Sequence, residues 1–313
     1  MSNNVKAGHK NKQSYANTRT TGKEQYYTSP ETVDLCLSEV QKHIDLAGRR
    51  ILEPSGGTGE FIKGLQRIGI DDSLIESYDI EPKHPMVQQA NYLETDFDSV
   101  GEGFVTITNP PFGRASSLAK KFFNHATNHC DYICYLIPKS WRKWTTHNSL
   151  DKRFHLIADI EMPKNCFYLP DGTENKKDVL NTVFQIWEKR ETKRKKIKIP
   201  DNGLIKKIQP SKKTVLDKNN KQVKRPDKIK GANFQIIVFG HSCGKCKRLD
   251  ENVEYDAKTT TMYLKIERDD VKSFLEGHDF SEYYNNVSYV QALSIEEINY
   301  ELNNHFGLKN FVF

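Results

Sequence analysis

Short strand-like runs alternate with helix-like patterns from residue 50 to residue 187 of this 313-residue chain. The strand-like runs are residues 50–53, 74–79, 104–108, 131–137, 157–162 and 179–187. The helical patterns among them are residues 59–68 and 117–129, and a further helical pattern, residues 30–45, precedes the series. Strands that alternate with helices form a mostly parallel sheet with helices on both faces. The chain is therefore predicted to hold an α/β domain whose ligands bind at the carboxyl ends of its strands.

Composition divides the chain into four regions. Residues 1–23 contain almost no large aliphatic side chains and predict a mobile basic arm. Residues 24–188 hold the alternating pattern and form the predicted catalytic domain. Residues 189–230, with 17 Lys and Arg against 4 Asp and Glu, predict a Lys-rich linker or poorly packed extension. Residues 231–313 predict a small α+β region that serves target recognition.

The charge distribution favours a polyanionic partner. Residues 189–230 have a net charge of +13, whereas residues 28–188 have a net charge of −6, with 17 Lys and Arg against 23 Asp and Glu. Basic side chains gathered on one segment neutralise phosphates and release counterions, which favours nucleic acid. A solvated lysine-rich linker is the other interpretation.

Neither a membrane segment nor a metal site is predicted. No apolar run reaches the ~20 residues of a membrane span, and the N-terminal residues lack a signal core, which predicts a cytoplasmic or other intracellular protein of bacterial, phage or viral type. His241, Cys243 and Cys246 have metal-like spacing, but no second pair accompanies them. A tight turn between strands is the favoured interpretation of this segment.

A stiff turn, Asn109-Pro110-Pro111-Phe112, follows the predicted strand at 104–108. The two prolines remove two backbone donors and prevent a helix at this point. The turn presents an amide side chain, a carbonyl group without a local partner and an aromatic ring. This combination suits a flat ring that carries an exocyclic amino group. A loop that simply ends the strand is the alternative.

A glycine-rich loop, Glu53 to Gly59, lies where the first strand of the alternating series ends and a helix begins. Glycines at such a place let the backbone approach a ligand closely. The loop lacks the Lys-Ser/Thr of a phosphate-binding loop and the strict pattern of dinucleotide binders. Asp79 ends the next strand, where an acid can accept both hydroxyls of a ribose. In a later loop, Asp96 can take an adenine amino group and Phe97 can flank the ring.

Together with Gln25 to Pro30, these segments resemble a known family in both content and order. They resemble the S-adenosylmethionine-dependent adenine-N6 DNA methyltransferases, which belong to the amino-methyltransferase class, with a gamma-type motif order and an NPPF catalytic motif. The resemblance covers residues 24–188. It implies a class I methyltransferase, Rossmann-like fold, S-adenosylmethionine as the cofactor and a carboxy-terminal recognition region.

The resemblance also implies the roles of individual residues. The implied catalytic residues are Asn109, Pro110, Pro111 and Phe112. The implied cofactor-binding residues are Tyr27, Thr28, Glu53, Pro54, Gly57, Gly59, Phe61, Asp79, Ile80, Asp96, Phe97 and Asn109. Phe112 is predicted to stack on the target base, and Phe167 is the candidate second wall of the base pocket, with core packing as the alternative. Trp141 and Trp144 are candidate contacts to nucleic acid, with an amphipathic surface helix as the alternative.

The predicted function is methyl transfer from S-adenosylmethionine to N6 of adenine in DNA. An RNA adenine-N6 methyltransferase, a protein glutamine methyltransferase and a degenerate nucleic-acid-binding subunit are the alternatives. The basic segment favours nucleic acid over protein, and DNA is the predicted partner over RNA. The presence of Gly57, Gly59, Asp79 and Asn109 disfavours the degenerate subunit. The sequence leaves the target sequence and the oligomeric state open.

Overall fold

The computed structural model describes residues 26–96, 101–164, 166–168, 173 and 180–311. The chain forms two compact units. Unit 1 comprises Met1–Ile137 and Phe154–Arg190, and unit 2 comprises Pro138–Arg153 and Glu191–Phe313. None of the described helices has the length and apolar character that are needed to cross a membrane.

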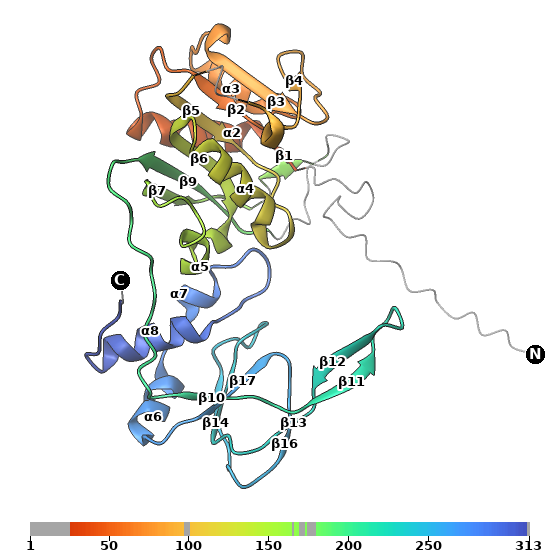
Figure 1. Ribbon diagram of the computed structural model, residues 1–313, viewed down its shortest axis with the longest axis vertical. Coiled ribbons are helices and arrows are strands. Elements are labelled where there is room, and N and C mark those ends of the chain that lie inside the picture. The colour runs from red at the N-terminus through yellow and green to blue at the C-terminus, as the bar shows by residue number, and fades with distance from the viewer. Residues whose placement is uncertain (1–25, 97–100, 165, 169–172, 174–179, 312–313) are drawn as a thin grey trace, which may run out of the picture. The chain divides into compact units, whose positions relative to one another are not determined.

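The core of unit 1 is a seven-stranded sheet (Figure 1). Its strands, in spatial order, are β4 (Gln88–Gln89), β3 (Ile75–Asp79), β2 (Ile51–Glu53), β5 (Phe104–Thr108), β6 (Cys130–Pro138), β9 (Thr182–Lys189) and β7 (Phe154–Glu161). The pairs from β4 to β6 are parallel, and β7 pairs antiparallel with β9. The predicted mostly parallel sheet is confirmed.

Helices cover both faces of this sheet. Neighbouring residues on a strand point to opposite faces. Burial raises the pKa of the Cys36 thiol on α2 (Pro30–His43), and the nearby Cys134 on β6 raises it further. Cys134 therefore faces α2. The next residue, Tyr135, packs instead on Phe123 of α4 (Ser117–Ala126), with ring centroids 5.9 Å apart. The two helices therefore lie on opposite faces.

α3 (Glu60–Arg67) packs against α2 through a glycine. A Cβ at Gly64 would lie 2.5 Å from Cγ1 of Val33, so only glycine permits this approach. The remaining small elements of unit 1 are β1 (Tyr27–Thr28), which pairs with β8 (Phe167–Tyr168), and the 3-10 turns η1 (Asp72–Leu74), η2 (Tyr92–Glu94) and η3 (Arg114–Ser116).

Unit 2 has its own antiparallel sheet and its own core. The sheet strands, in spatial order, are β10 (Lys206–Ile208), β17 (Thr261–Lys265), β14 (Phe234–Ile237) and β15 (Cys246–Arg248). The helices are α5 (Trp144–His147), α6 (Asp269–Gly277), α7 (Ser281–Tyr284) and α8 (Ile295–His305), with the 3-10 turn η4 (Lys139–Arg142). Two pairs of strands complete the unit: β11 (Lys212–Leu216) with β12 (Gln222–Pro226), and β13 (Lys228–Ile229) with β16 (Tyr255–Asp256). Its core includes Phe234, Leu264 and Ile298.

The boundaries of the units differ from those predicted. The segment 189–230 is more than a linker, because β10 and β13 pair with strands of unit 2, and Ile205 and Ile229 are buried. Each of the two strands contains a single apolar residue beside lysines, which hides the strand pattern. Residues 138–153, predicted to lie within the catalytic domain, belong to unit 2. There Trp141 is fully buried, and Trp144 packs on Tyr300 at 5.2 Å.

Candidate functional site

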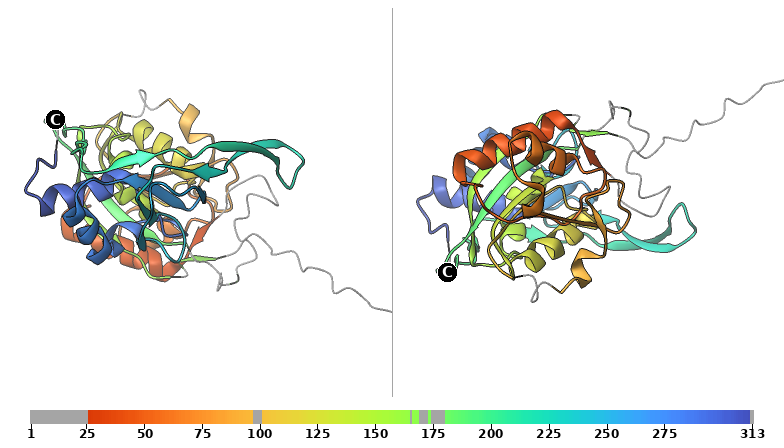
Figure 2. Two further views of the ribbon diagram at one scale, coloured as in Figure 1. Left: turned by 90° about the horizontal axis from the view of Figure 1, so that it is seen from below. Right: turned by 90° about the horizontal axis from the view of Figure 1, so that it is seen from above.

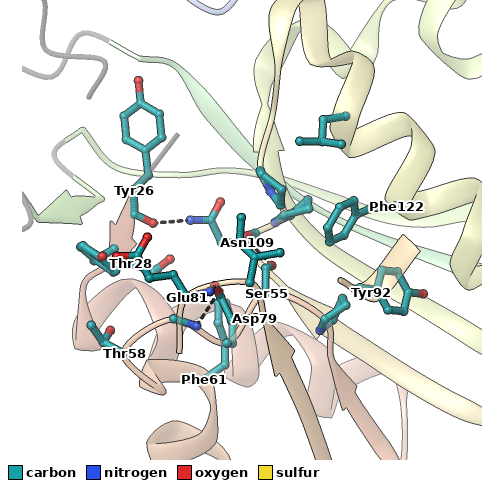
Figure 3. A pocket seen from close by; sticks show the side chains of 18 of the residues that line it. Tyr26, Thr28, Ser55, Thr58, Phe61, Asp79, Glu81, Tyr92, Asn109 and Phe122 are labelled. Atoms are coloured by element: carbon teal, nitrogen blue, oxygen red, sulfur yellow. Dashed lines mark hydrogen bonds between the residues drawn. The ribbon is translucent and has the colours of Figure 1, made fainter. Parts of the chain in front are cut away.

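A cavity of about 480 Å³ lies at the carboxyl ends of β2, β3 and β5 in unit 1 (Figure 3). This is the edge of the sheet at which the alternating pattern predicts ligand binding. Ten of the predicted site residues line the cavity. They are Tyr27, Thr28, Pro54, Gly57, Phe61, Asp79, Ile80, Asn109, Pro110 and Pro111.

The loop after β2 bends sharply and leaves no room for a side chain at two of its glycines. Gly57 and Gly59 have φ angles of +47° and +77°, which belong to the left-handed region. A Cβ at Gly56 would lie 2.2 Å from Oγ of Ser77, and one at Gly59 would lie 2.5 Å from Cγ of His84. At Gly56 and Gly57 the loop therefore presents its backbone to the cavity.

Asp79, at the end of β3, is oriented by backbone donors. The Gly57 amide donates to Oδ2 at 2.9 Å, and the Glu81 amide donates to Oδ1 at 2.8 Å. Each carboxylate oxygen keeps a further lone pair, because an ionised carboxylate offers about four acceptor sites. Asp79 can therefore accept the two hydroxyls of a ribose while the loop holds it. Beside it, the apolar side chain of Ile80 lines the cavity and is 56% exposed.

Glu53 lies behind the loop and is 1% exposed. Burial raises the pKa of its carboxyl to about 8, and the charge of Asp79 raises it as well, against hydrogen bonds from Thr108 and Ser55 that lower it. The Ser55 amide donates to Oε1 at 3.2 Å, and the Thr108 hydroxyl contacts the same oxygen. Glu53 is thus a neutral acid near pH 7.

A chain of hydroxyl contacts joins Glu53 to the tetrapeptide. Oγ1 of Thr108 lies 2.7 Å from Oγ of Ser55, which donates to the Asn109 carbonyl at 3.1 Å. At the other end of the chain, the Thr108 hydroxyl donates to Oε1 of Glu53. This chain ties the stiff turn to the glycine loop.

The side chain of Asn109 is held with its oxygen unpaired. Nδ2 donates to the Tyr26 carbonyl at 2.9 Å, which fixes the orientation of the amide because a carbonyl accepts only from a donor (Figure 3). Oδ1 is buried and has no hydrogen-bond partner among the residues that the structure describes. Buried polar atoms are almost always paired. Oδ1 is therefore an acceptor that a ligand is needed to satisfy.

The two phenylalanines predicted to face a base pack on a tyrosine instead. The ring of Tyr26 lies 5.8 Å from Phe112 and 5.3 Å from Phe167, measured between centroids. Phe112 and Phe167 are 4% and 1% exposed, and neither lines the cavity. In this structure Tyr26 fills the space next to Phe112.

Other predicted residues lie elsewhere. Asp96 is exposed and does not line the cavity, and Phe97 lies outside the described residues. Glu53 and Gly59 lie at the two ends of the glycine loop, and neither lines the cavity. Trp141 is fully buried, so its predicted contact with nucleic acid is wrong. A side chain with no exposed surface is out of reach of a polymer.

Sequence reasoning missed a second polar and aromatic pair. Asn91 and Tyr92 line the cavity, together with Leu118 and Phe122. The rings of Tyr92 and Phe122 lie 5.1 Å apart (Figure 3). The available signal was Asn-Tyr, one residue after the end of the short strand β4 and five positions before the Asp-Phe pair that we predicted.

No family model matches the sequence, and no curated protein matches it. Among solved structures, a proposed RNA methyltransferase from Pyrococcus horikoshii is similar at 14% identity and a TM-score of 0.42, over 53% of this chain and 88% of that one. A proposed class I S-adenosylmethionine-dependent methyltransferase from Listeria monocytogenes is 15% identical, with a TM-score of 0.38, over 54% of this chain and 62% of that one. The modification subunit of a proposed type I restriction enzyme from Vibrio vulnificus is 14% identical, with a TM-score of 0.39, over 55% of this chain and 46% of that one. Values this low carry no conclusion about the substrate of this chain.

Proposed function

We propose that this protein transfers a methyl group from S-adenosylmethionine to N6 of adenine in DNA. The observation that carries the proposal is the buried, unpaired Oδ1 of Asn109 at the edge of a cavity bounded by a glycine loop. An amino group supplies the hydrogen that this oxygen lacks. The order of the motifs along the chain supports the same reaction.

The residues that line the cavity fit the cofactor. The backbone of the glycine loop and Thr28 suit the methionine portion, and Asp79 suits the ribose hydroxyls. Ile80 and Phe122 offer apolar surfaces for a flat ring, and Asn91 offers an amide to its polar edge. When bound, the cofactor supplies an electrophilic methyl group.

Two acceptors of the stiff turn act on the target amino group. The lone pair of an adenine amino nitrogen is delocalised into the ring, so the nitrogen is a poor nucleophile. Oδ1 of Asn109 and the carbonyl of Pro110 accept its two hydrogens and orient its lone pair toward the methyl group. As positive charge develops on the nitrogen, the same oxygens stabilise that charge. The proton that the nitrogen loses after transfer leaves to solvent.

Tyr26 controls access to Phe112 in this proposal. A base stacks on Phe112 only if the Tyr26 ring moves, because that ring now packs against Phe112 and Phe167. The base must also leave its duplex, at a cost of about a few kcal/mol. Stacking on the freed aromatic rings offsets part of this cost.

The test is methyl transfer to four substrates in parallel. Duplex DNA, single-stranded DNA, RNA and a glutamine peptide are each incubated with the protein and labelled S-adenosylmethionine, and the modified nucleoside or residue is identified. We expect N6-methyladenine in DNA. Label in RNA or in the peptide alone contradicts the DNA assignment, and label in none of the four contradicts methyl transfer itself.

A further inference from the structure

A two-stranded ribbon projects from the rest of unit 2 (Figures 1 and 2). It is the hairpin of β11 and β12, whose strands pair with each other from Lys212↔Pro226 to Leu216↔Gln222 and form a sheet of their own. The strand residues are exposed apart from Val215, Val223 and Pro226, which are half-buried. A lone hairpin on this scale is marginally stable in water. Its exposed side chains are therefore open to contact with a ligand.

The hairpin is strongly basic, and three of its lysines form no ion pair among the described residues. Residues 212–226 contain six Lys and Arg and one acid, Asp217, a net charge of +5. Asp217 is committed to the turn, because it accepts the amides of Asn219 and Lys221 at 2.8 and 2.9 Å. Lys213 pairs with Asp227 at 2.7 Å. In the described part of the chain, Lys212, Lys221 and Lys224 form no ion pair within 4.0 Å.

The basic side chains occupy both faces of the ribbon. Directly paired residues share a face, and the faces alternate along each strand. The pair Lys213↔Arg225 lies on one face. Lys212 and Lys224 lie on the other. A flat polyanion would use one face only, whereas a groove has a phosphate backbone on each side.

We propose that this hairpin lies in the major groove of B-form duplex DNA, an inference that rests on the DNA substrate of the proposed function. Two strands about 4.8 Å apart, with their side chains, fit a groove about 12 Å wide. The major groove of A-form RNA is deep and narrow and does not admit them. At the tip, the 64% exposed side chain of Leu216 is an apolar contact suited to a thymine methyl group.

The test compares two triple variants with the same change of charge. The hairpin variant is Lys212→Gln, Lys221→Gln and Lys224→Gln. The control is Lys206→Gln, Lys207→Gln and Lys230→Gln, three exposed lysines of the same basic segment outside the hairpin. Circular dichroism and S-adenosylmethionine binding show whether each variant is folded.

Fluorescence anisotropy gives the Kd for a DNA duplex and for an RNA duplex of the same sequence, across a salt series. We expect the hairpin variant to bind the DNA duplex at least ~10-fold more weakly at low salt. The logarithm of the association constant decreases linearly with the logarithm of the salt concentration. The magnitude of that slope should decrease by about two to three, since each lost phosphate contact accounts for about 0.9. The control should change less on both measures.

A second arm locates the groove. Bulky substituents on C5 of the cytosines project into the major groove, and we expect them to remove the difference between the wild type and the hairpin variant. Equal losses in the two triple variants, an equal effect on the RNA duplex or an unaltered difference on the substituted duplex would overturn the proposal.

The outcome is separable from that of the proposed function. A protein that binds DNA through the hairpin but transfers no methyl group contradicts the function alone. A protein that methylates DNA while both variants bind alike contradicts the hairpin proposal alone.

Discussion

Asn109 uses its amide hydrogens to hold itself in place and leaves its oxygen for a ligand. Asn109→Ala removes that acceptor. We expect the rate of methyl transfer to fall by about 10²-fold or more, as for other lost transition-state hydrogen bonds, while the affinity for S-adenosylmethionine stays within about threefold. Single-turnover transfer and calorimetric titration measure the two quantities.

Asn91→Ala is the matched comparison, because Asn91 lines the same cavity and carries the same amide side chain. We expect this variant to weaken cofactor binding more than it slows transfer. Turnover retained in Asn109→Ala would contradict the proposed role of the amide oxygen.

Glu53 makes stability depend on pH. Its pKa is raised from 4.5 to about 8 on burial, so the neutral form favours the folded state. This stabilisation is fully present below about pH 4.5 and is lost as the pH rises through about 8. Glu53→Gln keeps a side-chain oxygen that can accept from Thr108 and stays neutral at every pH. We therefore expect the free energy of unfolding of the wild type, measured in urea from pH 5 to 8.5, to fall relative to that of the variant. Parallel pH profiles would disprove the linkage.

Among the elements, the loop between β2 and α3 tests the need for a close backbone approach. Gly59→Ala adds a Cβ 2.5 Å from Cγ of His84 at a φ of +77°. Gly48→Ala, at a φ of +67°, meets nothing within 4 Å and is the control. Both variants bear the left-handed cost of roughly 1–2 kcal/mol, and only the first also displaces a neighbour.

We expect Gly59→Ala to be the less stable variant in urea denaturation and to bind S-adenosylmethionine at least ~10-fold more weakly. Gly48→Ala should bind the cofactor as the wild type does. Equal cofactor affinity in the two variants would show that the shape of the loop does not matter.

At the scale of the whole molecule, residues 138–153 interrupt unit 1 in the sequence but belong to unit 2. A largely buried ion pair holds them there. Nζ of Lys143 lies 3.1 Å from Oε1 of Glu297 on α8, with side chains 22% and 7% exposed. Lys143→Met leaves Glu297 unpaired. We expect the free energy of unfolding of unit 2 to fall by an amount at the low end of ~3–5 kcal/mol. Lys63→Met breaks the more exposed pair with Glu60 in unit 1 and should cost less than ~1 kcal/mol.

Fluorotryptophan NMR during urea titration reads the two units separately. Trp141 and Trp144 lie in unit 2, and Trp187 lies in unit 1. Lys143→Met should lower the unfolding midpoint of the first two signals and leave that of Trp187 in place. An equal shift of all three signals would contradict the division.

Much of the fold is local in origin and was predictable. The strand at 104–108 was predicted with the bounds that the structure has, because it is a run of apolar and β-branched residues stopped by Asn-Pro-Pro. The helix from Pro30 begins where Ser29 caps it and ends at His43, two residues before the predicted end. The short strands β10 and β13 escaped prediction, because single apolar residues among lysines show no period.

The sequence by itself determined the alternating α/β architecture, the glycine loop and the stiff turn at Asn109. Each depends on backbone preferences and on apolar periodicity within a few residues. Tertiary structure alone decided that Asn109 bonds to the Tyr26 carbonyl, 83 residues away, and that Lys143 pairs with Glu297, 154 residues away. It also put Asn91 rather than Asp96 at the cavity. Such contacts join residues that are far apart in the sequence and are brought together only by the fold. Local backbone and side-chain preferences do not specify them.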